Sequence, residues 1–423
     1  MLISFFIVCV LIPYRSVKAR SDEVYEKLKI FSEVLSIIQK NYVEETTSEN
    51  LIYGSINGML RTLDPHSSFM PPDVYKELQV ETKGSFGGIG IEISIKEGVL
   101  TIISPIEDTP AFRAGLKAGD SIVKIDGVLT ENMSLFDAVK KMRGLTGTKV
   151  TISIMREGFT EPQEFVLSRE IIRITSVKNK LLEESIGYLR ISQFQEKTEE
   201  EFSKALDTLE KGTTPLTGLI LDLRNNPGGL LDQAVKVCDE FLEQGLIVYT
   251  QGRNEMQQMK FTATPNKKPH SYPLIVLVNA GSASGSEIVA GALQDHNRAV
   301  IVGTTTFGKG SVQTIIPLED GSGLRLTTAR YYTPRGISIQ AKGIIPDVVV
   351  KEAVTLKKDE KKETTMIKEK DLEGHFEPEE KAKEASVTDN EETDMPLARA
   401  VQLLKGWHIL KGSENHTQPT TEP

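Results

Sequence analysis

The chain has 423 residues, of which 39% are hydrophobic and 26% charged, a balance typical of a soluble protein with two or three domains. Its formal net charge of -9 argues against nucleic acid as the main partner, because phosphate binding requires a basic surface. The two cysteines, Cys9 and Cys238, are too few for a disulfide framework, and no C-x-x-C or H-E-x-x-H spacing occurs. We therefore expect neither a metal nor a cofactor.

Residues 1–20 contain an apolar run, residues 2–12, that has the length of a signal-peptide core and is too short for an ordinary spanning helix. Small residues follow at positions 17 and 19, where a signal peptidase would require them. We predict a signal peptide or membrane anchor in residues 1–20. The protein would then be exported, either periplasmic or tethered to the outer side of the inner membrane. A buried helix is the alternative interpretation.

Residues 21–83 are predicted to form an N-terminal helical arm. Apolar residues recur at steps of three and four from Leu28 to Ile38 and again from Leu51 to Leu60, and the helical pattern extends to about Met70. Asp64-Pro65 breaks the chain within it. The arm shows no residues with evident chemistry and is suited to packing or to dimer formation.

Residues 84–169 change to a β-rich pattern. A glycine-rich stretch, residues 84–90, leads into alternating residues 91–95. Further short strands are predicted at residues 99–103, 121–125, 149–155 and 164–167, and helices at residues 110–115 and 134–143. The pattern indicates a compact β-rich module with two helices.

Residues 170–350 alternate strands and helices. The predicted strands are residues 187–191, 218–223, 274–278 and 299–302, and the predicted helices are residues 197–209, 230–241 and 284–293. This alternation is typical of an α/β domain whose functional loops gather at strand ends. Residues 351–392 read as a charged linker, and residues 393–423 as a C-terminal helix and tail. We expect the amphipathic helix at residues 396–409 to dock on the core or to contact a second subunit.

A serine-rich segment, residues 278–287, is the most informative part of the chain. An apolar strand runs into small residues and then directly into a helix. Such a strand-to-helix elbow exposes a nucleophile, and the helix N-terminus stabilises developing negative charge. The alternative is a helix cap built from serines.

Lys309 lies in a loop of glycines and threonines, residues 303–313, that follows a buried strand. Burial disfavours the charged form, so a lysine in such surroundings tends to have a depressed pKa, and a neutral lysine can take a proton from serine. A phosphate loop is a weak alternative, because the G-x-x-x-x-G-K-[ST] spacing is missing.

A third loop, residues 221–229, runs from an apolar strand into two glycines and a helix. Glycine backbone can present N–H groups to an oxyanion without a side chain in the way. An ordinary strand–helix turn is the alternative.

The three segments DLRNNPGG, NAGSASGSEIVAGALQD and GTTTFGKGSVQT closely resemble the core motifs of the carboxyl-terminal processing (tail-specific) proteases. The resemblance extends to DPHSSFM in the arm, to FGGIGIEI at the start of a PDZ module, and to ARYYTPRGISIQAKGIIPD. It implies a crotonase/ClpP-like α/β protease core with an inserted β-rich PDZ domain and an N-terminal helical arm.

The resemblance also implies site residues. Ser284 would be the nucleophile, Lys309 the general base, and Gln313 the residue that orients the lysine. The N–H groups of Gly285 and Gly229 would form the oxyanion hole. The family usually has alanine at the position of Gly285, but only the backbone N–H is needed there.

In the PDZ module, the resemblance implies that Gly87, Gly88, Ile89, Gly90 and Ile91 hold the C-terminus of the substrate. A glycine-rich loop offers N–H groups to a terminal carboxylate, and the following strand edge accepts an extended peptide. Side chains of the helix at residues 134–143 would line the groove, namely Val139 and Met142.

The implied function is a serine endopeptidase that cleaves exported proteins near their C-termini by way of an acyl-enzyme. Its partners would be protein or peptide substrates with free C-termini, a second copy of the chain bound through the arm and the C-terminal helix, and an activating adaptor. One rival is a catalytically silent PDZ peptide-binding protein, against which the intact motif residues argue. The other is an acyl-CoA enzyme, which the PDZ module and the absence of a nucleotide-binding signature disfavour.

Other candidate residues are given lesser roles. Ser121 and Lys124 match S-x-x-K, but an alternating strand would send them to opposite faces. We expect His66 to be structural and His296 to be carried away from the elbow by its helix. Asp222 and Glu287 are interpreted as local supports and not as catalytic acids.

Overall fold

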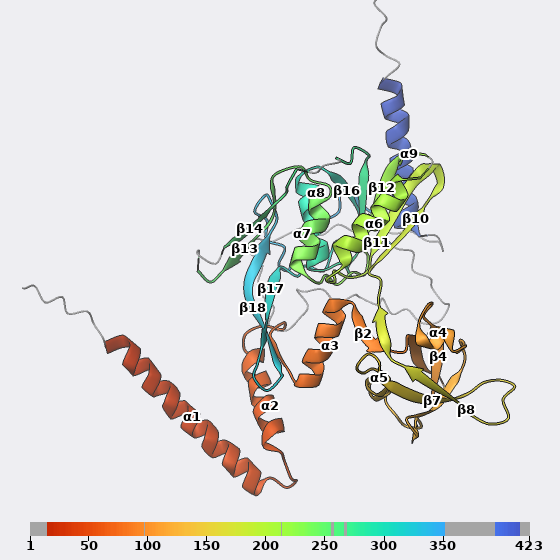
Figure 1. Ribbon diagram of the computed structural model, residues 1–423. Helices are drawn as coiled ribbons and strands as arrows, with labels where there is room; N and C mark the ends of the chain where they lie inside the picture. Colours follow the sequence, from red (N-terminus) through yellow and green to blue (C-terminus); the bar gives the residue numbers. More distant parts are fainter. Residues whose placement is uncertain are drawn as a thin grey trace, which may run out of the picture.

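The computed structural model describes residues 15–96, 98–212, 214–254, 258–265, 269–351 and 394–414. These residues form a helical arm, a β-rich module and a larger α/β core that carries the C-terminal helix (Figure 1). Residues 1–14 of the predicted signal segment and nearly all of the predicted charged linker lie outside the described residues. Among the helices of the described part, none combines the length and the apolar character needed to cross a membrane.

The core is built on a six-stranded sheet. Its order is β10 (Val177–Leu181), β11 (Ile186–Ile191), β12 (Gly218–Asp222), β15 (Leu274–Val278), β16 (Ala299–Gly303) and β19 (Val348–Val349). All neighbours are parallel except β10, which runs antiparallel to β11. Every residue of β12 and β15 is buried, as expected for parallel strands that are covered on both faces.

Helices cover both faces of this sheet. One face packs against α6 (Thr198–Glu210), α7 (Leu231–Asp239) and α8 (Gly285–Asp295). The other face packs against α9 (Met395–Glu414), which inserts the fully buried Ala400 and Leu404. The prediction that the C-terminal helix docks on the core is therefore confirmed, and the predicted strands and helices of this region are all present.

A second sheet was not predicted. Its order is β1 (Ser68–Met70), β18 (Gly323–Tyr332), β13 (Leu246–Gly252) and β14 (Met259–Thr262), with β17 (Ser311–Pro317) also paired to β18. The end of the helical pattern was placed wrongly at Met70, since residues 68–70 form a strand. The reason lies at Asp64, whose Oδ1 accepts the N–H groups of His66 and Ser67 at 2.8 Å each and so turns the chain toward β18.

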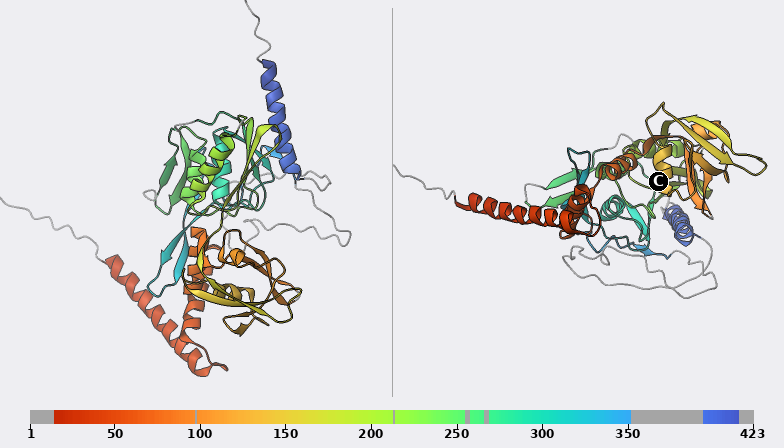
Figure 2. Two further views of the ribbon diagram at one scale, coloured as in Figure 1. Left: turned by 45° about the vertical axis from the view of Figure 1, so that its right-hand side comes forward. Right: turned by 90° about the horizontal axis from the view of Figure 1, so that it is seen from below.

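The arm consists of α1 (Arg15–Asn41), α2 (Ser48–Arg61) and α3 (Pro72–Lys83). Figures 1 and 2 show α1 projecting away from the rest of the molecule, whereas α2 and α3 lie beside the long β18. The arm is tied to the core by β1 and by Thr327 of β18, whose hydroxyl donates to Asp64.

The β-rich module has its own core. Its sheet has the order β3 (Ile91–Lys96), β4 (Val99–Pro105), β5 (Ser121–Ile125), β7 (Lys149–Met155) and β8 (Gln163–Ser168), with β6 (Val128–Leu129) paired to β5. Its helices are α4 (Pro110–Arg113) and α5 (Leu135–Met142). The strands and helices predicted for this module are confirmed. A two-stranded ladder, β2 (Ser85–Gly88) with β9 (Glu170–Arg173), joins the β-rich module to the core. Within the core, a 3₁₀ turn, η1 (Glu183–Ser185), lies between β10 and β11.

Candidate active site

Ser284 lies at the elbow between β15 and α8, as the sequence predicted. Its φ of 51° and ψ of -110° fall in a region that non-glycine residues rarely adopt. A serine at a strained strand-to-helix turn presents its hydroxyl above the helix N-terminus, which is the geometry of a nucleophile elbow.

The three serines of the elbow have different environments. Ser282 Oγ donates to Leu223 O at 2.8 Å, and Ser286 Oγ donates to Asn226 O at 2.9 Å. Both residues have no exposed surface, whereas Ser284 is 8% exposed. The hydroxyl groups of Ser282 and Ser286 therefore fasten the elbow to the loop after β12, and Ser284 is the one serine of the three that keeps some exposed surface.

The double glycine after β12 packs directly against this elbow. A Cβ on Gly228 would lie 2.8 Å from Ser284 Cβ and 2.9 Å from Gly285 N. Gly229 has a φ of 141°, and a Cβ there would lie 2.1 Å from Phe194 O. Both positions thus require glycine, for close approach to the elbow and to Phe194 respectively.

The oxyanion hole is predicted to consist of two N–H groups, that of Gly229 in the loop after β12 and that of Gly285 at the start of α8. Phe194 N donates to Gly228 O and Leu230 N donates to Phe194 O, so the N–H of Gly229, between them, points away from Phe194. Gly285 is the first residue of α8, whose leading N–H groups have no partner within the helix. The Phe194 ring packs against Gly285, with 3.0 Å between its Cδ2 and a Cβ built at that position.

The loop that carries Lys309 is fixed from two directions. On the elbow side, Phe307 N donates to Ser282 O at 3.0 Å. On the other side, the segment 340–344 holds it, since Ala341 N donates to Gly308 O at 2.8 Å and Gly310 N donates to Gln340 Oε1 at 3.0 Å. Lys309 itself is half-buried.

Glu287 connects the elbow with the Lys309 loop. Its carboxylate has no exposed surface and accepts four hydrogen bonds. Oε1 accepts from Thr306 Oγ1 at 2.5 Å and from Gly308 N at 2.7 Å, and Oε2 accepts from Ser284 N at 2.8 Å and from Lys309 N at 2.9 Å. Burial raises the pKa of Glu287 to about 7, and the donated hydrogen bonds act in the opposite direction.

Two further polar side chains lie nearby. Gln313 is the third residue of β17, and its Nε2 donates to Oγ of the buried Ser311 at 2.8 Å. Tyr331, on β18, is 5% exposed, and its N–H donates to Gly310 O. Burial raises the pKa of Tyr331 to about 12, and a hydrogen bond with the Ser284 side chain lowers it in part.

The candidates given lesser roles lie elsewhere. His296 follows the last turn of α8, opposite the end with Ser284, and its Nε2 meets Leu246 O at 2.7 Å. Asp222 is buried and accepts hydrogen bonds from Tyr188 and Arg224. Ser121 and Lys124 are on β5 of the β-rich module.

Comparison with known proteins gives three matches to family models. "Peptidase family S41" matches residues 185–350, "PDZ domain" matches residues 77–155, and "Activating protease CtpB N-terminal domain" matches residues 13–74. The carboxy-terminal-processing protease of Bartonella bacilliformis is 45% identical over 392 residues, which cover 91% of this chain and 90% of that protein. The carboxy-terminal processing protease CtpB of Bacillus subtilis is 38% identical over 337 residues, 78% of this chain and 68% of that protein. The chain belongs to the carboxyl-terminal processing proteases of peptidase family S41.

Among solved structures, the photosystem II D1 C-terminal processing protease has a TM-score of 0.44 and 32% sequence identity, and the match covers 76% of this chain and 92% of that one. The family models identify the α/β core as a domain of peptidase family S41 and the β-rich module as a PDZ domain.

The PDZ residues expected to bind peptide are only partly brought into one loop. Gly87 and Gly88 belong to β2 and pair with β9, which leaves Ile89 and Gly90 between β2 and β3. Strand β3 is the edge of its sheet and contacts α5, the helix of Val139 and Met142. Val139 is half-buried, but Met142 is 4% exposed and belongs to the PDZ core.

Sequence reasoning missed several residues of the protease site. The order Ser284-x-x-Glu287 is a capping-box pattern and could have revealed the bond from Ser284 N to Glu287. No local signal points to Phe194, Thr306 or Tyr331, because each reaches the elbow from a distant strand or loop.

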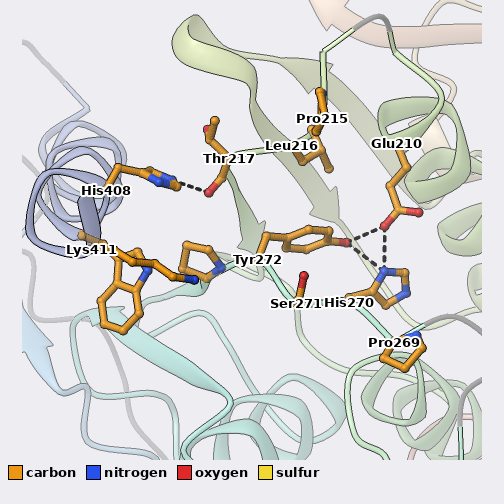
Figure 3. A pocket seen from close by; sticks show the side chains of 12 residues that line it. Glu210, Pro215, Leu216, Thr217, Pro269, His270, Ser271, Tyr272, His408 and Lys411 are labelled. Atoms are coloured by element: carbon orange, nitrogen blue, oxygen red, sulfur yellow. Dashed lines mark hydrogen bonds and ion pairs between the residues drawn. The ribbon is translucent and has the colours of Figure 1, made fainter. Parts of the chain in front are cut away.

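A pocket of about 410 Å³ opens far from the elbow, between the end of α9 and the residues that lead into β12 and β15. Figure 3 shows Glu210, His270 and Tyr272 gathered on one wall. Glu210 Oε1 lies 2.7 Å from His270 Nδ1 and 3.0 Å from the Tyr272 hydroxyl. No residue of the elbow or of the Lys309 loop lines this pocket, and its polar groups join α6 to the start of β15.

Proposed function

We propose that this protease cleaves exported proteins near their C-termini, with Ser284 as nucleophile and Lys309 as general base. The observation that carries the proposal is the shared contact at Glu287 Oε2, which accepts the backbone N–H of both residues. The strained backbone of Ser284 and its access to solvent support its role as nucleophile. Proximity of nucleophile and base is the geometric requirement for activating a serine hydroxyl.

The reaction follows the usual acyl-transfer sequence. The neutral amine of Lys309 takes the hydroxyl proton while Ser284 Oγ attacks the scissile carbonyl, and the N–H groups of Gly285 and Gly229 stabilise the oxyanion. The protonated lysine then gives its proton to the leaving amine, and an acyl-enzyme remains. Lys309 next deprotonates a water molecule that attacks the ester, and it returns a proton to Ser284 as the product carboxylate leaves. Gln313 would orient Lys309 through its amide oxygen, since its amide nitrogen donates to Ser311.

Recognition of the substrate is assigned to the PDZ domain. The N–H groups between Gly87 and Ile91 would hold the terminal carboxylate, and the edge of β3 would add the peptide as a strand beside α5. The edge position of β3 and the exposure of parts of its surface, such as Ile95 at 45%, support this assignment.

The organisation of the chain is part of the same proposal. We place the arm at residues 21–83, the PDZ domain at 84–169, the protease core at 170–350, the linker at 351–392 and the C-terminal helix and tail at 393–423, after an export segment at 1–20. The parallel order β11-β12-β15-β16 with helices on both faces supports a crotonase-like core. The site would lie in the periplasm or on the outer side of the inner membrane.

A homodimer and an activating adaptor belong to the proposal as well. Helix α1 exposes large apolar residues between Val24 and Ile37, and the end of α9 exposes three more. Those of α1 include Leu28 (53%), Phe31 (42%) and Val34 (48%), and those of α9 are Trp407 (53%), Ile409 (74%) and Leu410 (68%). Burial of such surfaces against a second copy would be favourable.

The proposal is tested with the full chain and unfolded casein as substrate. Ser284→Ala and Lys309→Ala should each abolish cleavage while the circular dichroism spectrum and the unfolding transition stay like those of the parent. Mass spectrometry of the parent's products should find early cuts near the casein C-terminus. Cleavage by a folded Ser284→Ala variant would refute the dyad, and cuts distributed evenly along casein would refute tail-directed action.

A further inference from the structure

Glu287 takes no part in the proton transfers of the proposed reaction, although it lies between the two residues that perform them. It has no exposed surface, and each of its carboxylate oxygens accepts two hydrogen bonds. A buried carboxylate is costly unless its hydrogen-bonding capacity is met, so the four donors account for its stability in this position.

The donors come from both sides of the site. Ser284 N belongs to the elbow, and Gly308 N and Lys309 N belong to the lysine loop. These three backbone N–H groups can only donate. The fourth donor is the Thr306 hydroxyl, which accepts from Ile344 N at 2.7 Å and so has its own hydrogen available for Glu287.

We propose that Glu287 is the positioning residue of the catalytic dyad, a buried carboxylate that holds the nucleophile elbow and the base loop at a fixed separation. Oε2 accepts hydrogen bonds from the backbone N–H groups of Ser284 and Lys309. Oε1 binds the base loop by accepting from the Thr306 hydroxyl and the Gly308 N–H. The inference rests on the proposed function, since it assigns Glu287 a role for the Ser284–Lys309 pair. It goes beyond the helix cap that the Ser284-x-x-Glu287 pattern would supply, because three of the four donors, Thr306 Oγ1, Gly308 N and Lys309 N, lie outside α8 and its cap.

The geometry distinguishes two substitutions of similar size. In Glu287→Met no acceptor remains for any of the donors. In Glu287→Gln the amide oxygen can take the place of Oε2 and keep both dyad contacts. The amide nitrogen then donates to Thr306 Oγ1 and faces only the N–H of Gly308 as an unfavourable neighbour.

The test measures kcat and KM with a quenched-fluorescence peptide that has a free apolar C-terminus. We expect kcat to fall about tenfold in Glu287→Gln and at least about 100-fold in Glu287→Met, because displacement of reacting groups by about 1 Å has effects of that size. KM should stay within about twofold of the parent value, since the PDZ domain is untouched. A folded Glu287→Met variant with parental kcat, equal kcat in both variants, or a change in KM alone would overturn the inference.

Thr306→Val keeps the inference testable if Glu287→Met does not fold. It removes one donor to Oε1 and the acceptor of Ile344 N, leaves the three backbone donors to Glu287 in place, and we expect kcat to fall several-fold to about tenfold. An unchanged kcat in folded Thr306→Val would contradict the proposal. Glu210→Gln is the matched control, because Glu210 is another largely buried carboxylate of the same domain with its partners His270 and Tyr272 far from the elbow. It should lower stability without changing kcat.

The same assays distinguish a failure of the proposed dyad from a failure of the positioning role of Glu287. If Ser284→Ala still cleaves, the dyad itself is wrong and the role of Glu287 falls with it. If Ser284→Ala and Lys309→Ala are inactive while Glu287→Gln and Glu287→Met match the parent, the dyad stands and only the positioning role fails.

Discussion

The hydroxyl groups of Ser282 and Ser286 differ from that of Ser284 in what they bind. Each donates to a backbone carbonyl of the loop after β12, whereas the Ser284 side chain forms a hydrogen bond with Tyr331 and is 8% exposed. Replacing either Ser282 or Ser286 with alanine should therefore cost about 1 kcal/mol of the free energy of unfolding. Urea denaturation measures that loss, and the kcat/KM of the folded variants should stay within a few-fold of the parent. An inactive, folded Ser282→Ala or Ser286→Ala variant would move the nucleophile away from Ser284.

Glu287 makes stability and activity respond to pH in opposite directions. Burial raises its pKa from 4.5 to about 7, so between these values the folded state binds more protons than the unfolded state. The contribution of Glu287 to stability is fully present below about pH 4.5 and is lost as the pH rises through about 7, by about 3 kcal/mol in all. Over the same window kcat/KM should rise if the proposed positioning role holds, because ionised Glu287 accepts the N–H groups of both Ser284 and Lys309.

This prediction is checked by comparing the parent with Glu287→Gln, which cannot ionise. The difference between their free energies of unfolding should shift against the parent as the pH is raised from about 4.5 to about 7. A difference that does not change with pH would show that Glu287 keeps one protonation state throughout. In the proposed mechanism, a rising limb that remains in the activity of the variant is assigned to the general base Lys309, so replacing His66 and His296 with glutamine should leave it in place.

The sequence located the motifs of the site but not the contacts between them. The elbow, the glycine pair and the Lys309 loop each have a local composition that predicts their geometry. Glu287 was interpreted as a local support, which agrees with its buried, acceptor-only contacts. Thr306 and Tyr331 could not be identified, because their role arises from strands and loops that meet only in the folded chain.

At the scale of elements, His270 connects the C-terminal end of α6 with the residues that precede β15, through its contact with Glu210. Hydrogen bonding to Glu240 raises the pKa of His270, burial lowers it, and Glu210 raises it further, so the net shift is upward from 6.5. A raised histidine pKa adds stability that is fully present below about pH 6.5 and disappears as the pH rises through the higher value in the folded state. Tyr272 and Arg298 are the other ionisable groups at this joint.

His270→Gln should therefore destabilise the protein more at about pH 6 than at about pH 9. Thermal unfolding at the two pH values measures the difference, and Figure 3 shows the contacts that the substitution removes. Equal losses at both values would mean that His270 stays neutral in the folded protein. Activity of the folded fraction should not change, since this joint is remote from the elbow.

Which elements were predicted follows from how they are buried. The strands β11, β12 and β15 are nearly fully buried and are rich in apolar residues, so their composition alone reveals them. Strands β17 and β18 are mostly half-buried or exposed, with polar residues mixed into them, and neither period two nor an apolar run is evident. The same sheet includes β1 from the arm, a pairing that joins residues about 250 positions apart and leaves no local trace.

At the scale of the whole molecule, the proposal assigns recognition and cleavage to separate domains. If the PDZ domain binds the terminal carboxylate, peptides with a free apolar C-terminus should bind Ser284→Ala at least about tenfold more tightly than their amidated forms, because charge-assisted hydrogen bonds are lost on amidation. Isothermal titration with the inactive variant avoids cleavage during the measurement. Equal affinities would remove carboxylate capture from the proposal.

The hydrogen bonds that fix the Lys309 loop come in part from residues 340–344, which follow it in the chain. A chain that ends before residue 340 contains Ser284 and Lys309 but lacks Gln340, Ala341 and Ile344, which bind Gly310, Gly308 and Thr306. Completion of the site therefore depends on residues that follow it in the sequence. A truncation at that point should leave the Lys309 loop without these three contacts, although both residues of the proposed dyad are present.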